Sequence, residues 1–476
     1  MPAMQLTTLL RDSRALAALA VPLILTQLAQ VALTTTDTVM MGLLGTADLA
    51  AGGLAIVLFN QLRTMGVGLV TSVGNQIAAA SARAEGAQEA EAGAADVRQG
   101  GDEVRAIVRA GLTVATLAGA AGAVLMLLIG RALGLLGQDA GVVQRAQTML
   151  LALAPGLLPC LWFQAIRQFT VGMRRPQALL RITLASVAVN AGLNWALIHG
   201  TWGLPRLGLP GVGVATSVVY LLSCLALYLS AKRDPALGPL LSLDLVKADR
   251  PTVRRLVRLG VPIAATYGSE AGFFSVTALM AGSFGSAALA AHTAVNQLVY
   301  IVFQVAVGLS HAASLNVSRE LALGRTDTAL RIKNTALACA GAVMVVVGLL
   351  YVTLPGLVLS PFFDTDSPAD AEAVTLATRL LLVIMVLQFF DCAQNIGIGL
   401  LRGLDDTKSG FRITLVGYWA IGLPAAWLLG YAAGLHTLGI WLGLLTGLAA
   451  TAVLLLRRYS ASLRTRFAAQ QTVPAA

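Results

Sequence analysis

The stretch ALAALAVPLILTQLAQVALTTTDTVMMGLLGTA (15–47) carries a single charged residue, Asp37, in a long apolar run. A helix of about 20 apolar residues crosses the ~30 Å hydrocarbon core of a bilayer. The stretch therefore predicts a transmembrane helix with one carboxylate inside it. An ionised carboxylate at the bilayer centre costs at least about 2.5–3.5 kcal/mol. We therefore expect Asp37 to face a cavity, to have a partner or to take up a proton.

The rest of the chain has the same character. Its 476 residues are 57% hydrophobic and only 12% charged, and the mean hydropathy is +0.77. A soluble protein needs more charge to cover its surface, so this composition predicts an all-α integral membrane protein with many spans. Twelve apolar runs are long enough to cross a bilayer: 15–44, 49–80, 104–130, 146–171, 178–199, 211–231, 256–281, 288–318, 333–354, 373–401, 411–431 and 437–456.

The placement of charge predicts the orientation. The formal net charge is +10, and 28 of the 33 Lys and Arg residues lie on one side of the twelve predicted spans, with four on the other. Basic residues gather in cytoplasmic loops, so we expect both termini on the cytoplasmic side of a bacterial inner membrane. The basic charge then reflects topology in a lipid bilayer, and we expect no nucleic-acid partner.

An internal repeat divides the chain into two halves. LAVPLILT (19–26) matches LGVPIAAT (259–266) at an offset of 240, and RITL (181–184) recurs at 412–415 at an offset of 231. We expect an N-terminal six-helix bundle (1–231), a cytoplasmic linker (232–254), and a C-terminal six-helix bundle with a short tail (255–476). Because each half has an even number of spans, the bundles are related by a pseudo-twofold axis along the membrane normal. Transporters use this plan, with bundles that rock about a central site.

Three acids lie inside predicted spans: Asp37 in the first, Glu270 in the seventh and Asp391 in the tenth. At the offset of 240 Glu270 corresponds to Gln30, which precedes Asp37 by seven residues, almost two helical turns. Asp37 and Glu270 thus share nearly the same face of equivalent helices. Asp391 corresponds to Cys160, so the two halves differ in chemistry. For each acid the alternative is a structural carboxylate with a hydrogen-bonding partner.

Asn190 and Asn194 in the fifth span are four residues apart, so their amides share one helix face. Together with Asp37 and a threonine hydroxyl from 34–36, they could supply oxygen ligands for Na⁺. The same carboxylate could instead bind a proton. Interhelical hydrogen bonding explains the two amides equally well.

Weaker signals surround these acids. Arg63 is the one basic residue deep in a predicted span, and we interpret it as structural, with a counter-ion to an acid as the alternative. The polar segment 82–103 is rich in Ala, Gly and Glu, and we interpret it as a long loop. Six aromatic residues crowd the second-half acids, where they either wall a cavity that receives flat cations or serve ordinary helix packing: Tyr267, Phe273, Phe274, Tyr300, Phe389 and Phe390.

These motifs together resemble the multidrug and toxic compound extrusion (MATE) family, in its NorM-like branch. The resemblance covers nearly the whole chain and rests on five segments in order: DTVMMG (37–42), NAGLNWALIHG (190–200) with GLPGVGVATS (208–217), VPIAATYGSE (261–270), AAHTAVNQLVY (290–300) and DCAQNIGIGLLRGLDDTKSG (391–410). It implies a first-half cation site at Asp37, Asn190 and Asn194. It also implies a second-half site at Glu270 and Asp391.

The resemblance further implies a monomeric secondary transporter rather than an enzyme. Such a protein needs no cofactor and exports drugs and toxic organic cations, often bulky and aromatic, in exchange for Na⁺ or H⁺. One alternative is a lipid or saccharide-lipid flippase, which should line its cavity with several basic residues. Another is a membrane prenyl transferase, which needs paired Asp motifs for Mg²⁺-diphosphate, and Asp405-Asp406 has no second motif.

Overall fold

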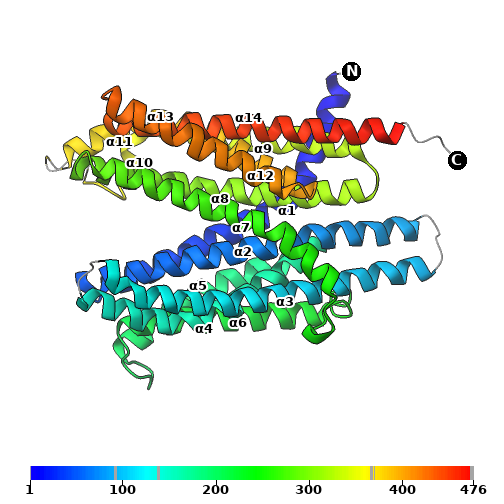
Figure 1. Cartoon of the computed structure of the whole chain (residues 1–476), viewed down its shortest axis with the longest axis horizontal. Helices are drawn as coiled ribbons and strands as arrows, with labels where there is room; N and C mark the ends of the chain where they lie inside the picture. Colours follow the sequence, from blue (N-terminus) through cyan, green and yellow to red (C-terminus); the bar gives the residue numbers. More distant parts are fainter. Residues whose placement is uncertain (1, 90–93, 137–139, 365–367, 369, 472–476) are drawn as a thin grey trace. The chain divides into compact units, whose positions relative to one another are not determined.

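The computed structural model describes residues 2–89, 94–136, 140–364, 368 and 370–471, and these residues form helices and no strands (Figure 1). The first half contains α1 (Pro2–Gly42), α2 (Thr46–Glu89), α3 (Ala94–Ala132), η1 (Leu133–Leu136), α4 (Ala140–Gly172), α5 (Gln177–His199) and α6 (Leu209–Arg233). The second half contains η2 (Leu245–Lys247), α7 (Arg250–Gly282), α8 (Ser286–Ala322), α9 (Thr326–Thr353), α10 (Pro355–Leu359) and α11 (Ala371–Gly403). It ends with α12 (Thr407–Leu415), η3 (Val416–Gly422), α13 (Leu423–Trp427), η4 (Leu428–Ala432) and α14 (His436–Gln471).

The described chain contains twelve long helical segments when α12, η3, α13 and η4, which run without a break over 407–432, are counted as one. Eleven of the twelve are long and apolar enough to cross a membrane. The exception is α7, which begins with a basic stretch (Arg250, Arg254, Arg255 and Arg258) and contains Glu270. The predicted all-α fold with twelve long helices is confirmed.

The internal repeat is visible in the backbone as well as in the sequence. Gly45 and Gly285, which are 240 residues apart, both follow the first helix of their half with positive φ angles of 114° and 110°. Arg174 and Asp405, which are 231 residues apart, have φ angles of 57° and 62°. A positive φ is uncommon for residues other than glycine. Equivalent turns therefore end equivalent helices in the two halves.

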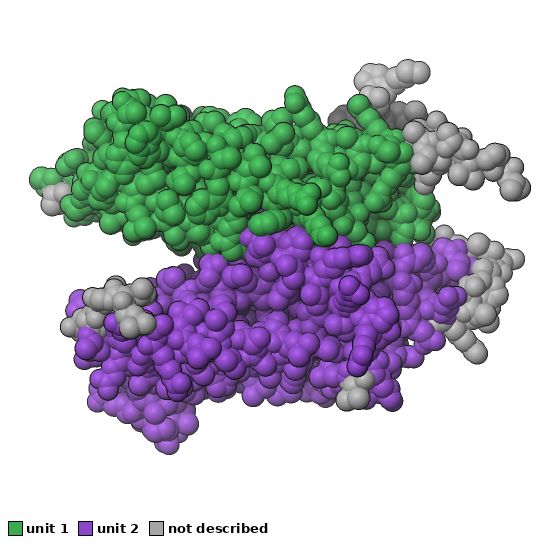
Figure 2. Space-filling model, viewed as in Figure 1, with its two compact units in different colours: residues 1–24, 268–476 green, residues 25–267 purple. Residues whose placement is uncertain are grey.

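Two compact units make up the molecule, and each contains a short segment from the other half of the sequence (Figure 2). Unit 1 consists of 1–24 and 268–476, and unit 2 consists of 25–267. The first helix of each half, α1 or α7, is thus divided between the units. The predicted bundle boundaries at 231 and 255 stay a prediction.

In each unit, a glycine allows the short segment from the other half of the sequence to lie close to a neighbouring helix. In unit 2, a Cβ atom added to Gly68 of α2 would lie 2.7 Å from the Cα atom of Ala264 of α7. In unit 1, a Cβ atom on Gly308 of α8 would lie 3.0 Å from the Cα atom of Ile24 of α1. Both residues of the first pair lie 240 positions from their counterparts in the second. Small residues allow such close backbone contact between membrane helices, where dispersion forces replace the hydrophobic effect.

The loop interpretation of 82–103 was wrong for the residues that the structure describes. α2 continues to Glu89 and α3 begins at Ala94, so 82–89 and 94–103 are helical. Ala, Glu, Gln and Arg, which dominate this segment, are strong helix formers even where no lipid surrounds them. Arg83 Nη2 donates to Glu103 Oε1 at 2.6 Å and joins the two helix extensions.

Candidate functional site

Asp37 lies in the interior of unit 2, where three side chains surround its carboxylate. Asn190 and Asn194 of α5 donate from Nδ2 to Asp37 Oδ1 at 2.6 and 2.7 Å. The Thr216 hydroxyl of α6 lies 3.0 Å from both Asp37 Oδ2 and the Val212 backbone oxygen, and it donates its proton to one or the other. Only 2% of Asp37 is exposed, so these donors replace water around the charge. The structure therefore brings the predicted residues Asp37, Asn190 and Asn194 together.

The two asparagine amides each retain an oxygen with no partner. Oδ1 of Asn190 and Oδ1 of Asn194 are buried and accept no hydrogen bond from the described residues. An amide that turns over exchanges its oxygen and nitrogen, so both oxygens can be directed at Asp37. The resulting set is a carboxylate, two amide oxygens and a hydroxyl, all of which are oxygen ligands of the kind that hard cations prefer. These residues fit Na⁺ as well as a proton.

The hydroxyl at this site comes from a residue that sequence reasoning missed. Thr34 donates to the backbone oxygens of Gln30 and Val31, at 3.2 and 2.9 Å, and Thr36 donates to that of Ala32 at 2.8 Å. Threonine commonly bonds back to its own helix in this way. No signal in the sequence singled out Thr216, because threonine is common in membrane helices and Ser217 stands directly beside it.

Glu270 and Asp391 lie close together within unit 1, with Gln394 between them. Gln394 Nε2 donates to Glu270 Oε1 and to Asp391 Oδ1, at 3.4 Å in each case. The Tyr418 hydroxyl donates to Glu270 Oε1 at 3.1 Å, and Asn395 Nδ2 donates to Asp391 Oδ1 at 3.2 Å. Two carboxylates that share one amide repel each other, which favours uptake of a cation by the pair.

A change of helix type positions Tyr418. The segment η3 is π-helical and follows the α-helical α12 without a break. π-helical turns inside α-helices are frequent at functional sites. Phe273 of α7 stacks on Tyr418, with ring centroids 4.9 Å apart and planes 10° apart, and Gln394 also donates to the Tyr418 hydroxyl. Sequence reasoning missed both Tyr418 and Gln394, although Gln394 stands one turn after Asp391.

Three of the six predicted aromatic residues belong to the packed interior of unit 1. Phe273 is fully buried, and Phe274 meets it edge-on with ring centroids 5.9 Å apart. Phe390 packs against the same core and is partly buried. Phe273 therefore supports Tyr418 rather than standing at a surface.

The other three predicted aromatic residues are more accessible. Tyr300 and Phe389 of unit 1 are 43% and 37% exposed, and Tyr300 stacks with Phe303 at a centroid distance of 6.4 Å. Tyr267 ends unit 2 and is half-buried. The role of all six as a wall for substrate stays a prediction.

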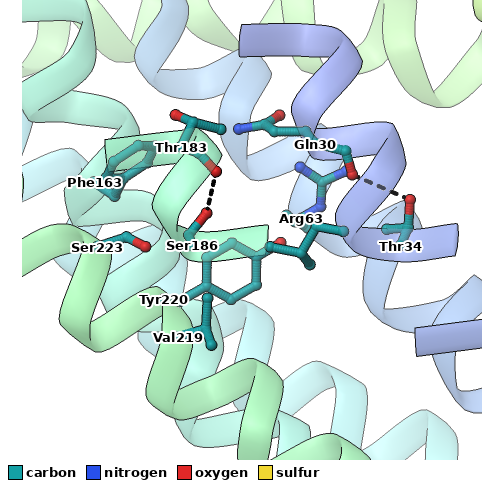
Figure 3. Close-up of a pocket in the computed structure, with 10 residues that line it drawn as sticks. Gln30, Thr34, Arg63, Phe163, Thr183, Ser186, Val219, Tyr220 and Ser223 are labelled. Carbon is teal, nitrogen blue, oxygen red and sulfur yellow. Dashed lines mark hydrogen bonds between the residues drawn. The ribbon is translucent and has the colours of Figure 1, made fainter. Parts of the chain in front are cut away.

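A small cavity of about 20 Å³ lies inside unit 2 (Figure 3). A cavity of this volume can hold one or two water molecules. Arg63 lines it, and Arg63 Nε donates to Asn60 Oδ1 at 3.2 Å. The remaining lining residues come from α1, α4, α5 and α6 and include five hydroxyl side chains: Gln30, Leu33, Thr34, Phe163, Thr183, Ser186, Val219, Tyr220 and Ser223.

A second arginine of unit 2, Arg167 near the end of α4, is buried, whereas Arg63 is half-buried. Arg167 is 3% exposed and donates to Gln164 Oε1 at 3.1 Å. The interpretation of Arg63 as a structural residue, or as a counter-ion to an acid, stays a prediction.

Comparisons with known proteins agree on one family. A sequence model of the MatE family matches residues 22–196 and 262–428. The "Probable multidrug resistance protein NorM" of Pseudomonas aeruginosa is 36% identical over 446 residues, which are 93% of this chain and 88% of that protein. The protein of the same name from Bradyrhizobium diazoefficiens is 37% identical over 443 residues, which are 93% of this chain and 91% of that protein.

Solved structures show the same fold. A MATE structure in the bent conformation has a TM-score of 0.83 at 16% identity, with 98% of this chain and 99% of that chain covered. The eukaryotic MATE transporter AtDTX14 has a TM-score of 0.78 at 22% identity, with 96% of this chain and 99% of that chain covered.

Proposed function

This chain belongs to the MatE family of membrane transporters, and from that premise we propose that it exports bulky, cationic aromatic drugs in exchange for Na⁺ or H⁺. It is a multi-pass membrane protein and not an enzyme. We place it in a bacterial inner membrane with both termini in the cytoplasm. The main support for the proposal is the environment of the buried Asp37. Three side chains lie within hydrogen-bond distance of its carboxylate, and the two asparagine oxygens beside it have no hydrogen-bond partner among the described residues.

Coupling follows from a change of charge at Asp37. Without a coupling ion the carboxylate is negative, and the Asn190, Asn194 and Thr216 side chains donate to it. Na⁺ or H⁺ removes that charge, and the two amides turn over to present oxygen. A ligand shifts a conformational equilibrium only through different affinities for the two states. The ion therefore favours one state and the cationic drug the other, because both compete for the same negative charge.

The acid pair of unit 1 has two candidate roles. Glu270 and Asp391, joined by Gln394, bind either a second coupling ion or the positive group of the drug. Both roles need at least one carboxylate to be ionised for part of the cycle. The roles differ in which compounds depend on the pair, and this difference can be measured.

Lipid export is the remaining alternative. The buried Arg167 adds a second guanidinium to the half-buried Arg63 in the same unit, and several basic groups are the feature that a phosphate-binding flippase would need. The curated relatives are named as multidrug resistance proteins, and their names favour drugs as the substrate class. Family membership removes the prenyl transferase alternative.

Asp37→Asn tests the coupling site. We expect this variant to insert normally but to give no drug resistance in a host that lacks its own efflux pumps, because an amide carries no negative charge for Na⁺ to neutralise and takes up no proton. The matched control is Asp48→Asn, which removes an acid from the exposed ion pair with Arg145 and should leave resistance unchanged. Wild-type resistance for Asp37→Asn at equal expression would contradict the assignment.

Imposed gradients identify the coupling ion. Dye uptake into everted membrane vesicles, in which an exporter moves dye inward, should follow either a Na⁺ gradient at constant pH or a pH gradient without Na⁺. Dye movement that both gradients leave unchanged would refute cation coupling altogether.

Glu270→Gln and Asp391→Asn divide the two roles of the acid pair. If the pair binds a coupling ion, both variants should lose the efflux of every compound. If it binds drug, they should lose cationic compounds at least about tenfold more than neutral ones, since an ionic hydrogen bond contributes ~1.5–3 kcal/mol. Unchanged resistance to all compounds would exclude both roles.

A further inference from the structure

Three arginines form a stripe along the first part of α7. Arg250, Arg254 and Arg258 follow one another at intervals of four residues, and all three are exposed. At about 100° per residue, they lie within an arc of about 80° on the helix surface. The other side of the helix packs on α2: Leu256 is 1% exposed, and a Cβ atom on Gly260 would lie 2.8 Å from the Cα atom of Leu69. The stripe therefore faces away from α2.

The charges of the stripe are not neutralised within the chain. Over the residues that the structure describes, no acid pairs with Arg250, Arg254 or Arg258. The acids in the segment before the stripe each have another partner: Asp234 pairs with Arg175 at 2.8 Å, Asp244 pairs with Lys247 at 3.2 Å, and Asp249 accepts from the Thr252 hydroxyl at 2.8 Å. Three guanidinium groups are thus left to interact with something outside the chain.

Helix stability does not account for the stripe. A helix carries a partial positive charge at its N-terminus, so a basic residue is unfavourable in the first turn, where Arg250 lies. The internal repeat does not account for it either. At the offset of 240, Arg250 and Arg258 correspond to Leu10 and Ala18. The stripe is therefore a feature of α7 that its counterpart α1 lacks.

The same face of α7 becomes apolar directly after Arg258. Val261 lies within the arc of the three arginines and is 50% exposed. An exposed apolar side chain on a membrane helix contacts lipid chains. Arg258 and Arg254 precede Val261 by about 5 and 10 Å along the helix axis, and a headgroup layer is about 5–8 Å thick. The stripe therefore begins at the level of the lipid headgroups and extends to their outer edge.

A phospholipid headgroup complements the stripe in charge and in geometry. Arginine binds phosphate through two parallel N–H···O bonds. Neighbouring arginines of the stripe are about 6 Å apart along the axis, and their long side chains can bend toward the membrane. Two of them can therefore reach one phosphate. An anionic lipid is favoured over a zwitterionic one, because the latter carries a positive group that the guanidinium groups repel.

We propose that Arg250, Arg254 and Arg258 bind the headgroup of an anionic phospholipid. The binding site lies on unit 2 alone and involves neither Asp37 nor the acid pair of unit 1. The proposal therefore goes beyond drug export, and it does not depend on which compounds the protein moves.

Native mass spectrometry of the full-length protein in detergent tests this site. Phosphatidylglycerol and phosphatidylcholine with the same acyl chains serve as the anionic and the zwitterionic probe. One basic residue near the membrane surface contributes about a fivefold gain in affinity. Arg254→Gln/Arg258→Gln should therefore weaken phosphatidylglycerol binding about 20-fold and change phosphatidylcholine binding by less than about twofold. Arg254→Lys/Arg258→Lys keeps both charges and should lose less than about threefold.

Arg379→Gln is the matched control for Arg254→Gln. Arg379 is exposed on α11, and the residues from 375 to 378 and from 380 to 383 carry no charge. Arg254→Gln should weaken phosphatidylglycerol binding about fivefold. Arg379→Gln should weaken it less than about twofold, because a lone arginine does not share a phosphate with a neighbour. Since these side chains are exposed, all variants should elute from gel filtration like the wild type.

Four outcomes would overturn the lipid site. Equal binding of the two lipids by the wild type would exclude recognition of charge, and wild-type binding by Arg254→Gln/Arg258→Gln would place the lipid elsewhere. Equal losses in Arg254→Gln and Arg379→Gln would mean that net charge alone attracts the lipid. Displacement by inorganic phosphate at the concentration of the lipid would make a soluble anion the occupant. Failure of the export proposal is a separate result, because a protein that moved no drug under any ion gradient would still bind lipid here.

Discussion

Thr216 shows how a single hydroxyl can complete the hydrogen bonding of a buried carboxylate. Asn190 and Asn194 both donate to the same oxygen of Asp37, and among the described residues Thr216 is the one donor within reach of the other. Without Thr216 that oxygen would lack its donor in an interior that water does not reach, and a buried acceptor without a partner costs about 1–3 kcal/mol. The hydroxyl is also the one neutral ligand that need not turn over when a cation binds, because its oxygen already faces Asp37.

Thr216→Val should therefore change the response to the coupling ion, because the valine fills the same volume but offers neither donor nor ligand. If the ion is Na⁺, we expect its concentration for half-maximal efflux to rise about tenfold, since an oxygen ligand is lost. If the ion is H⁺, we expect the half-maximal proton concentration to fall, since the ionised carboxylate loses a donor that stabilises it. Thr216→Ser should stay close to wild type. Thr36→Val is the matched control, because Thr36 bonds only to Ala32 of its own helix. An unchanged ion dependence in Thr216→Val would remove Thr216 from the site.

The parts of this site that could be predicted are those that rare residues mark. A carboxylate in an apolar run is conspicuous, and so are two asparagines spaced by one turn, which is why Asp37, Asn190 and Asn194 were found. Thr216 and Tyr418 could not be found in this way, since threonine and tyrosine are common in membrane helices. Their roles depend on how α6 and η3 pack against other helices, which a linear pattern does not contain.

At the scale of the element, glycines decide where α1 and α7 cross their neighbours. Gly68 meets backbone atoms of Ala264, and Gly308 meets backbone atoms of Ile24. Backbone cannot rotate away as a side chain can, so neither crossing has room for a methyl group. The same offset of 240 could have paired these glycines from sequence, but their partners on other helices could not have been named.

Gly68→Ala should destabilise the protein in detergent. An added Cβ atom would force α2 and α7 apart, and overpacking of this kind costs about 1–3 kcal/mol. We expect a lower midpoint of thermal aggregation, measured by gel-filtration fluorescence. Gly53→Ala on the same helix is the control, because a Cβ atom there meets nothing within 4 Å. Equal midpoints for the two variants would mean that the crossing tolerates a methyl group.

The lengths of the apolar runs predicted the number of long helices correctly, but they did not predict where the helices end. The twelve predicted runs correspond to the twelve long segments, yet α2 and α3 extend through 82–89 and 94–103. Hydropathy marks the part of a helix that lipid surrounds. It does not mark the part that continues into water, where helix propensity decides.

At the scale of the whole molecule, charge placement leads to a topology that can be measured. We expect alkaline phosphatase to be active when fused after Arg206, between α5 and α6, and inactive when fused after Lys247, between α6 and α7. Fusions of green fluorescent protein to the C-terminus should fluoresce. These outcomes follow from the concentration of Lys and Arg in predicted cytoplasmic loops. The opposite pattern of enzyme activity would reverse the orientation.

The exchange of helix segments has a consequence for biosynthesis. Unit 2 needs residues up to 267, and unit 1 needs residues 1–24 from the very start of the chain. Neither unit is complete when the ribosome has finished the first six helices. The first part of α1 (residues 2–24) therefore enters the membrane before the helices of unit 1 that it packs against have been synthesised. A chain cut between Arg233 and Arg250 would give two fragments that each lack a piece of their own unit, and the fragments should fold only when both are produced in the same cell.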